Sequence, residues 1–409
     1  MSHRPQAPGS TPRQLFVSTP AERTALARRQ FFEEGVRPSG LVGEAVIQSW
    51  MRCTRTHYDR QRIVPFDPVT PSRLHSTLQR NRALIDAAGP DLFSMEGTLA
   101  GTDCRVILTD RDGVVLHVTH HPAAAHQPVL RATSRPGVNI SESIVGTTAP
   151  GIVASTGMAC TVDGAEHYFD MLLDLQCAAA PIRDVHGRLA GVLDLTVEAR
   201  RFGFDAAAMV GLYATTIENR LLQAQSRQHL VLRFQAHPAL LGTPLEALAA
   251  VASDGRVVWL NGAAVRLIGP LPEDAEERGV ERLLGHPLAT LLRLGRRDAA
   301  QPLRLPSGLG VWVHASMPAA DGKDFRHAVA TGFALAPTVD AVAAPACADA
   351  ALPIAPGTGT ETLRDHSRKL IEETLAAHEG NISHTARQLG VSRGTLYRQL
   401  RRWSGDGGS

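Results

Sequence analysis

The chain has 409 residues, which is enough for roughly two or three domains. Its 44% hydrophobic residues and formal net charge of +2 exclude a chain that is disordered throughout. Its five cysteines include no C-x-x-C pair, which argues against a disulfide framework and a structural zinc site and is typical of a reducing cytoplasm. No apolar run approaches the roughly 18 residues of a membrane span and the first residues lack a signal core, so we expect a cytoplasmic protein without membrane contacts.

The N-terminal part of the chain is predicted to be helical after a flexible tail. Residues 1–20 are rich in proline, serine and threonine, whereas residues 21–88 carry helical patterns, clearest in AERTALARRQFFEEG and LVGEAVIQSWMRC. In the second pattern Trp50 and Cys53 lie three residues apart and share one helical face. We expect this helix to pack against the domain that follows.

Residues 89–232 mix short strand signals with turns. CRVILTDRDGVVLHVT predicts two strands joined at Asp112–Gly113, and CAAAPIRDVHGRLAGVLDLTV repeats the pattern with a turn at His186–Gly187. A helix from Ala206 to about Leu232 follows, and its wide apolar stripe predicts burial on its own domain together with a dimer contact. These elements indicate an α+β sensor-like domain.

The second half of the chain repeats this design on a smaller scale. Residues 237–335 contain a strand, a turn at Asp254–Gly255, a strand and a short helix, and later a hairpin in LRLPSGLGVWVHASM. Residues 336–360 are rich in alanine and proline and read as a linker. The sequence therefore predicts an α+β multidomain chain: tail (1–20), N-terminal helical region (21–88), sensor domain with trailing helix (89–232), smaller α+β domain (237–335), linker (336–360) and all-α C-terminal domain (361–409).

The C-terminal domain carries the pattern of a helix-turn-helix. Gly380 ends a first helix, Asn381 caps a second, Gly390 ends it, and Ser392 caps a third. Two helices joined by a tight glycine turn place the second of them in the DNA major groove. Residues 381–403 contain five arginines and no acidic residue, which suits contacts to phosphates and base edges.

The same stretch contains GVSRG, which also fits the G-x-S-x-G pattern of serine hydrolases. No buried strand precedes it, and no histidine follows Ser392, so a catalytic triad in that order cannot be completed. We interpret Ser392 as a helix cap and expect no catalytic residue and no enzyme activity. An enzyme acting through Ser392 or Cys177 remains the alternative that probe labelling would have to support.

These C-terminal motifs resemble the Fis-type helix-turn-helix. The positions that carry the resemblance are Gly380, Asn381, Gly390, Val391, Ser392, Arg393, Thr395, Leu396 and Leu400. The resemblance implies DNA contacts by Asn381, Ser383, Ser392, Arg393, Thr395 and Arg398, and it places His384 where the family can carry a basic residue. Charge on the third helix adds Arg401 and Arg402 as DNA-binding candidates.

A second resemblance covers about residues 40–220. SWMRC, GVNISESIVGTTAPG, GAEHYFD and CAAAPIRDVHGRLAGVLDLT look like the N-terminal half of acetoin-catabolism-type regulators, in which this region is a GAF sensor domain. DGRVVWLNGAAVRLIG and LLGHPLATLL in residues 237–335 are similar to PAS domains, another fold that senses small molecules. The resemblance implies a transcription regulator with a GAF-type sensor, a PAS-like domain and a small-molecule effector.

Regulators of that type are usually sigma-54 activators with an ATPase domain before the helix-turn-helix, and this chain departs from them there. A P-loop needs a lysine followed by serine or threonine, whereas Lys323 precedes Asp324 and Lys369 precedes Leu370. We therefore expect no ATPase activity. The expected partners are operator DNA, a small-molecule effector, a second copy of the chain and RNA polymerase. The alternative is a signalling adaptor that forms mixed dimers with an ATPase-bearing activator.

The candidate ligand-binding residues lie in the middle of the sensor segment. They combine titratable groups with apolar neighbours, which suits a small polar ligand, although each also has a purely structural interpretation. They are Glu166, His167, Tyr168 and Cys177. Two groups of side chains in this region carry metal-ligating atoms: a histidine cluster, and a cysteine, an aspartate and a histidine that could bind iron. Neither group has the spacing of a metal site, so we expect no metal and no cofactor. These two sets are His117, His120, His121 and His126, and Cys160, Asp163 and His167.

Overall fold

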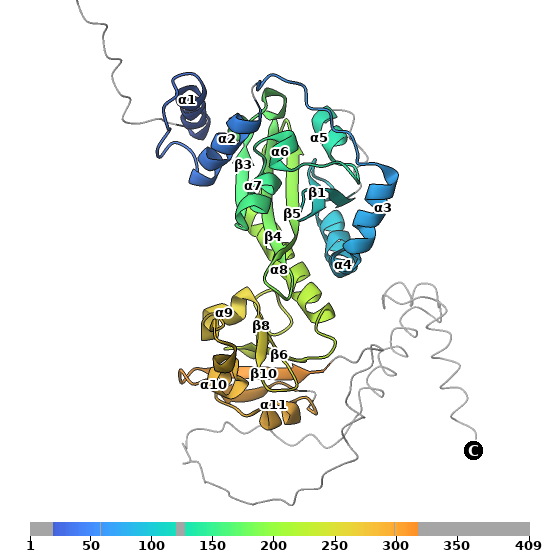
Figure 1. Cartoon of the computed structure of the whole chain (residues 1–409), viewed down its shortest axis with the longest axis vertical. Coiled ribbons are helices and arrows are strands. Elements are labelled where there is room, and N and C mark those ends of the chain that lie inside the picture. The colour runs from blue at the N-terminus through green and yellow to red at the C-terminus, as the bar shows by residue number, and fades with distance from the viewer. Residues whose placement is uncertain (1–18, 58, 120–126, 298, 318–409) are drawn as a thin grey trace, which may run out of the picture. The chain divides into compact units, whose positions relative to one another are not determined.

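The computed structural model describes residues 19–57, 59–119, 127–297 and 299–317, which contain two five-stranded antiparallel sheets (Figure 1). Residues 1–18 of the predicted tail, the linker and the C-terminal DNA-binding residues lie outside the described residues, whereas Pro20, the last residue assigned to the tail, begins the first helix. No helix in the described ranges is long and apolar enough to cross a membrane. An α+β chain is therefore confirmed for this part of the molecule.

The first sheet has the strand order β2-β1-β5-β4-β3. Both predicted hairpins are confirmed, β1 pairing with β2 and β4 with β5. At the first turn Gly113 has φ +81°, and an added Cβ would lie 2.8 Å from the backbone nitrogen of Ser141, so only glycine fits. The strands are β1 (Arg105–Asp110), β2 (Val115–Val118), β3 (Cys160–Asp163), β4 (Leu175–Arg183) and β5 (Leu189–Glu198).

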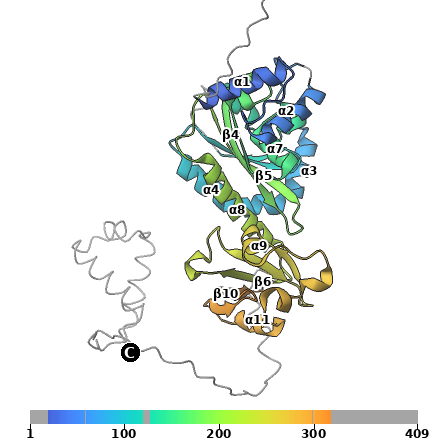
Figure 2. The ribbon, with the colours of Figure 1, turned by 90° about the vertical axis from the view of Figure 1, so that its left-hand side faces the viewer.

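One face of the first sheet is covered by α4 (Arg82–Leu99) and α8 (Ala206–Ala224), as Figure 2 shows. Helix α4 begins after α3 (Pro71–Arg80) and runs across residue 88, where the sequence placed a boundary. The apolar stripe of α8 packs on its own domain as predicted, since Val210, Ile217 and Leu221 are buried there. The dimer contact of α8 stays a prediction.

The end of α8 was predicted wrongly. The helix stops at Ala224, and β6 begins at Leu230, inside the range that the sequence assigned to helix. Strand β6 lies between β7 and β10 in the second sheet, and its residues Leu230 and Leu232 are buried there. Pairing on both sides outweighs the local helical pattern, as tertiary contacts commonly do.

The other face of the first sheet carries short helices and the N-terminal helices. Trp50 and Cys53 of α2 are buried in the same hydrophobic cluster as Ile107 of β1 and Cys177 of β4, which confirms the predicted packing of this helix on the sensor. The helices around this face are α1 (Pro20–Phe32), α2 (Glu44–Thr56), α5 (Pro128–Thr133), α6 (Glu142–Val145), α7 (Ala149–Thr156) and the 3-10 turns η2 (Gly164–Glu166) and η3 (Asp170–Leu172). We call residues 19–224, the first sheet and these helices, the N-terminal domain.

The second sheet has the order β8-β7-β6-β10-β9 and its own hydrophobic core. The predicted turn at Asp254–Gly255 joins β7 to β8, and the predicted later hairpin is β9–β10. Its strands are β6 (Leu230–Gln235), β7 (Ala247–Val251), β8 (Val257–Leu260), β9 (Gln301–Arg304) and β10 (Gly310–Ser316). Its helices are η4 (Pro238–Leu240), α9 (Gly262–Ile268), η5 (Ala275–Arg278), α10 (Val280–Leu284) and α11 (Leu288–Leu294).

Candidate ligand-binding site

A small cavity lies on the face of the first sheet that turns away from α4 and α8. Its volume is about 30 Å³, which suits one ordered water and is far below the about 300–1,000 Å³ of typical ligand pockets. Polar side chains from β4, β5, α5 and the residue before α7 meet apolar ones around it. The lining residues are Phe66, Ile107, Thr133, Ile140, Val145, Thr148, Pro150, Leu172, Leu175, Cys177, Asp194 and Thr196.

Strand alternation places Asp194 at this cavity. In β5, Leu193 and Leu195 face α4 and α8, so Asp194 and Thr196 face the opposite side. Asp194 is 1% exposed, its Oδ2 accepts a hydrogen bond from Thr196 Oγ1 at 2.5 Å, and its Oδ1 has no partner among the described residues. Burial raises the pKa of Asp194 to about 7, so near neutral pH the group is partly a neutral acid that can donate a hydrogen bond.

His167 and Cys177 extend this polar cluster along the sheet. The Nε2 atom of His167 lies 3.6 Å from Cys177 Sγ, and Thr196 Oγ1 lies 3.3 Å from the same sulfur. His167 Nδ1 is 2.9 Å from the carbonyl oxygen of Gly164, which assigns the proton to Nδ1 and leaves Nε2 as an acceptor. Four neutral or nearly neutral polar groups therefore follow one another: His167, Cys177, Thr196 and Asp194.

The protonation of these groups follows from burial. Burial lowers the pKa of His167 to about 4 and raises the pKa of Cys177 well above its ordinary value. The histidine is thus neutral and the cysteine is a thiol at neutral pH. Because a nucleophilic cysteine requires the thiolate, this environment favours binding chemistry over catalysis by Cys177.

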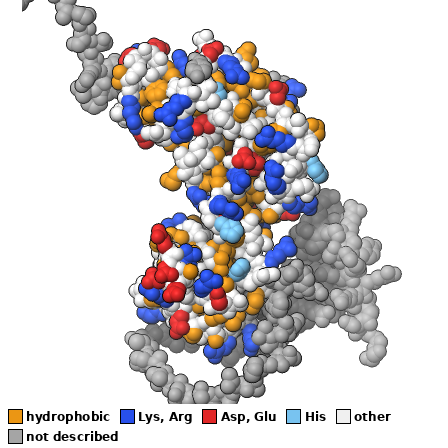
Figure 3. All heavy atoms as spheres, viewed as in Figure 1, with side chains coloured by type: hydrophobic (Ala, Val, Ile, Leu, Met, Phe, Trp, Pro, Cys, Tyr) orange, Lys and Arg blue, Asp and Glu red, His pale blue; other side chains and the backbone are white. Residues whose placement is uncertain are grey.

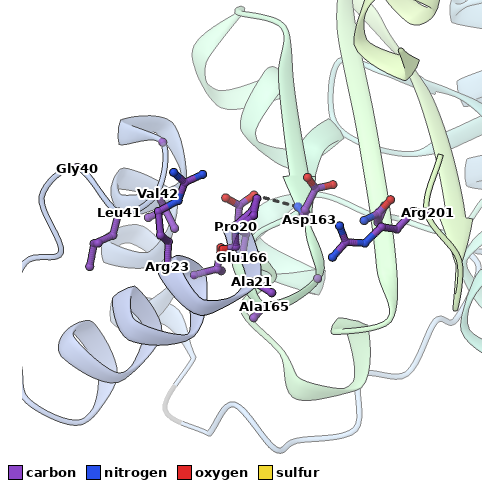
Figure 4. Close-up of a pocket in the computed structure, with 14 residues that line it drawn as sticks. Pro20, Ala21, Arg23, Gly40, Leu41, Val42, Asp163, Ala165, Glu166 and Arg201 are labelled. Carbon is purple, nitrogen blue, oxygen red and sulfur yellow. Dashed lines mark hydrogen bonds between the residues drawn. The ribbon is translucent and has the colours of Figure 1, made fainter. Parts of the chain in front are cut away.

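The structure brings two of the four predicted ligand residues together and separates the other two. His167 and Cys177 are adjacent, as described above. The hydroxyl of Tyr168 donates to the carbonyl oxygen of His57 at 2.6 Å, and its ring packs against Phe32. The side chain of Glu166 instead lines a second pocket, of about 560 Å³, between the N-terminal helices and the end of β3 (Figure 4).

Asp194 and Thr196 were not predicted from the sequence. A signal was present, because Asp194 is an acidic residue inside an otherwise apolar strand, GVLDLTV. A carboxylate is rarely buried without a partner, so its position in a strand with apolar neighbours on both sides marks a special site.

The wall of the site that carries His167 is held by the two N-terminal helices. Arg28 of α1 donates to the carbonyl oxygens of Ala165 at 3.2 Å, His167 at 2.6 Å and Tyr168 at 3.1 Å. Trp50 Nε1 of α2 donates to the carbonyl oxygen of Glu166 at 2.7 Å. The N-terminal helices therefore fix the backbone from which His167 reaches the sheet.

Several predicted residues have no part in this site. His117 lies on β2, where burial lowers its pKa, whereas His120, His121 and His126 lie outside the described residues. Within the described ranges no three histidine, cysteine or acidic side chains are placed to hold a metal ion. The predicted DNA contacts also lie outside those ranges: Asn381, Ser383, His384, Ser392, Arg393, Thr395, Arg398, Arg401 and Arg402.

Two family models match the chain. The family described as "MimR, N-terminal domain" matches residues 19–213, which cover the cavity and the N-terminal helices that hold its wall. The family described as "Bacterial regulatory protein, Fis family" matches residues 362–403. The resemblance that the sequence motifs indicated at both places is thus confirmed.

Individual relatives agree with these families. The chain is 33% identical over 231 residues to the acetoin catabolism regulatory protein of Cupriavidus necator, covering 55% of this chain and 34% of that protein. It is 30% identical over 294 residues to the propane 2-monooxygenase operon transcriptional activator MimR of Mycolicibacterium goodii, covering 71% of this chain and 47% of that protein. The chain thus spans between a third and a half of the length of these relatives.

Among solved structures, the complex of the N-terminal part of Escherichia coli DhaR with DhaL is similar, with a TM-score of 0.42 and 17% identity over 67% of this chain and 99% of that chain. By the family models and the curated relatives, the chain is similar to the acetoin-catabolism-type transcriptional regulators, with residues 19–213 matching the MimR N-terminal family and residues 362–403 the Fis family.

Proposed function

We propose that the chain is a DNA-binding transcription regulator that senses a small uncharged molecule in the cavity at Asp194 and has no ATPase activity. The observation that carries the sensing role is the buried carboxyl oxygen Oδ1 of Asp194, which has no hydrogen-bond partner among the residues that the structure describes and belongs to a residue that lines a cavity. A buried polar atom without a hydrogen bond is costly, and a ligand hydroxyl or carbonyl would remove that cost.

The chemistry of the cavity favours a short, neutral effector. Asp194 is partly neutral near pH 7, the other polar lining groups are uncharged and the rest of the lining is apolar, so an anion would lose its hydration there without compensation. The relatives regulate acetoin catabolism and a propane 2-monooxygenase operon, and acetoin and propan-2-ol are small neutral molecules that carry a hydroxyl group. Since the cavity has only about 30 Å³, such an effector would enter by displacing part of its wall.

The fold types of the two sheet domains are assigned from their sequence resemblances. We assign the N-terminal domain to the GAF type and residues 230–317 to the PAS type. Both are α+β units built on a five-stranded antiparallel sheet with its own core, which supports the assignment. The cavity lies in the first of them.

DNA binding is assigned to residues 361–409, and the protein is expected to act as a homodimer. A single short recognition helix reads few base pairs, whereas two such helices about 34–36 Å apart read two half-sites. Figure 3 shows basic and acidic side chains interspersed on the described part of one face, without a continuous basic surface.

Replacing Arg393 with alanine is expected to weaken binding to the operator by about 5- to 150-fold, because a base contact by arginine contributes about 1–3 kcal/mol of discrimination. Binding of the purified chain to DNA from its own upstream region, measured by fluorescence anisotropy over a series of salt concentrations, checks this. Arg387→Ala is the matched control, because it removes an arginine of the same segment that is not among the predicted contacts.

Equal binding by the wild type and Arg393→Ala, seen only at low salt, would contradict sequence-specific recognition by this residue. The adaptor function would then be favoured.

The observation that supports an adaptor is the short interval between the two family matches. The intervening residues 214–361 hold no lysine followed by serine or threonine and hence no P-loop. Co-purification with an ATPase-bearing regulator would be its test.

A further inference from the structure

The pocket at Glu166 is assembled from segments that are far apart in the sequence (Figure 4). Its walls come from one side of α1 (Pro20, Ala21, Arg23 and Thr24), residues 40–43 before α2, residues 163–166, Gln176 of β4 and Arg201 after β5. The volume of about 560 Å³ lies within the about 300–1,000 Å³ that commonly hold small ligands. The pocket therefore exists only while the N-terminal helices are docked on the end of β3.

Hydrogen bonds fix the polar walls of this pocket. Glu166 Oε2 accepts from the backbone nitrogen of Asp163 at 2.9 Å, and Trp50 holds the carbonyl oxygen of Glu166 at 2.7 Å. Gln176 Oε1 accepts a hydrogen bond from the backbone nitrogen of Phe202 at 3.2 Å. The amide nitrogen of Gln176, which is a donor, takes no part in that bond. The site is thus organised before any ligand arrives.

The pocket is lined by two basic and two acidic side chains. Arg23 and Arg201 line it, and no ion pair joins either guanidinium to a carboxylate within the described ranges, whereas Arg200 Nε lies 2.9 Å from Asp103 Oδ2. Asp163 and Glu166 supply the carboxyl groups. Burial raises the pKa of Glu166 to about 7 and also raises the pKa of Asp163, a shift that Arg201 opposes.

These groups select a ligand by charge and shape. Glu166 already accepts a hydrogen bond from the backbone nitrogen of Asp163, whereas no ion pair within the described ranges holds the guanidinium of Arg23 or Arg201, so the pocket offers its cationic groups to an anion. A planar carboxylate matches the fork of an arginine, whereas the remaining charge of Asp163 opposes a dianion. Asp163 also offers an acceptor to a donor group on the ligand. We propose that this pocket binds a small monocarboxylate that carries a hydroxyl or ammonium group, at a site separate from the cavity at Asp194.

Isothermal titration of the full chain with lactate and with lactamide tests this proposal, because the two molecules share a shape and differ in charge. Lactate is expected to bind in the millimolar range and lactamide at least about tenfold more weakly. Arg201→Gln is expected to weaken lactate binding by about tenfold or more, while the matched variant Arg200→Gln, whose arginine is paired with Asp103, binds as the wild type does.

Three results would overturn the proposal: no binding of lactate, equal binding of lactate and lactamide, or unchanged binding by Arg201→Gln. Tighter binding of inorganic phosphate than of lactate would also overturn it, since that indicates a general anion surface. The variant Asp194→Leu tests whether this site is independent of the cavity at Asp194. It should bind lactate as the wild type does, even if it no longer responds to a neutral effector.

Discussion

Replacement of Trp50 by alanine is expected to lower the free energy of unfolding of the N-terminal domain by about 3–5 kcal/mol. The indole is fully buried, its ring centroid lies 5.4 Å from that of Phe31 and 5.1 Å from that of Phe32, and its Nε1 donates to the carbonyl oxygen of Glu166. The substitution leaves a cavity and a backbone carbonyl without its partner. Urea unfolding of the full chain, followed by circular dichroism, measures the loss.

Trp312→Ala is the matched control for this prediction. Trp312 lies on β10 in the second sheet and is 36% exposed, so its removal is expected to cost no more than about 1 kcal/mol. A Trp50→Ala protein that unfolds at the same urea concentration as the Trp312→Ala protein would contradict the view that the N-terminal helices are part of the sensor core.

The stability of the protein is expected to depend on pH through Asp194. Its pKa is raised from 3.8 to about 7 by burial, so the folded protein holds a proton that the unfolded chain has already lost. The stability that this proton provides is fully present below about pH 4, declines by about 1.4 kcal/mol per pH unit, and is gone above about pH 7. Asp194→Asn cannot titrate and lacks this decline.

Unfolding free energies of the wild type and Asp194→Asn, measured at roughly pH 5 and pH 7, check the prediction. Relative to Asp194→Asn, the wild type should lose about 2 kcal/mol between these two conditions. Other carboxyl groups with raised pKa values, such as Glu166, are present in both proteins, so their effect cancels in the comparison.

Asp254→Asn provides the control for this titration. A hydrogen bond from the backbone of Arg256 lowers the pKa of the exposed Asp254, so its contribution is present above the ordinary pKa and is lost only as the solution becomes strongly acidic. Its difference from the wild type should stay constant between roughly pH 5 and pH 7. A flat difference for Asp194→Asn as well would show that Asp194 is ionised in the folded protein.

Local signals in the sequence were sufficient for much of the fold. The hairpins at Asp112–Gly113 and His186–Gly187 were predictable because their turns are encoded by adjacent residues. The packing of Trp50 was predictable from the spacing on one helical face. The start of β6 at Leu230 was not, because that strand exists through its pairing with β7 and β10, which are distant in the sequence.

The candidate site was only half predictable for the same reason. Glu166, His167 and Tyr168 are consecutive, yet a 3-10 turn that ends at Glu166 sends their side chains to a pocket, the cavity cluster and an aromatic cluster respectively. Sequence order gives no sign of this divergence. Asp194 could be suspected from the apolar strand around it. That its Oδ1 has no partner in the described part of the chain is visible only once α7 and η3 are in place.

A neutral effector bound at Asp194 is expected to change the affinity of the chain for its operator. The measurement that tests it most directly is operator binding of the full chain, followed by fluorescence anisotropy, with increasing acetoin or propan-2-ol, for the wild type and Asp194→Leu. We predict a shift of about 5- to 150-fold in the wild type, which corresponds to a coupling of about 1–3 kcal/mol, and none in Asp194→Leu. A shift of the same size in both proteins, or specific DNA binding that neither molecule changes, would contradict the claim.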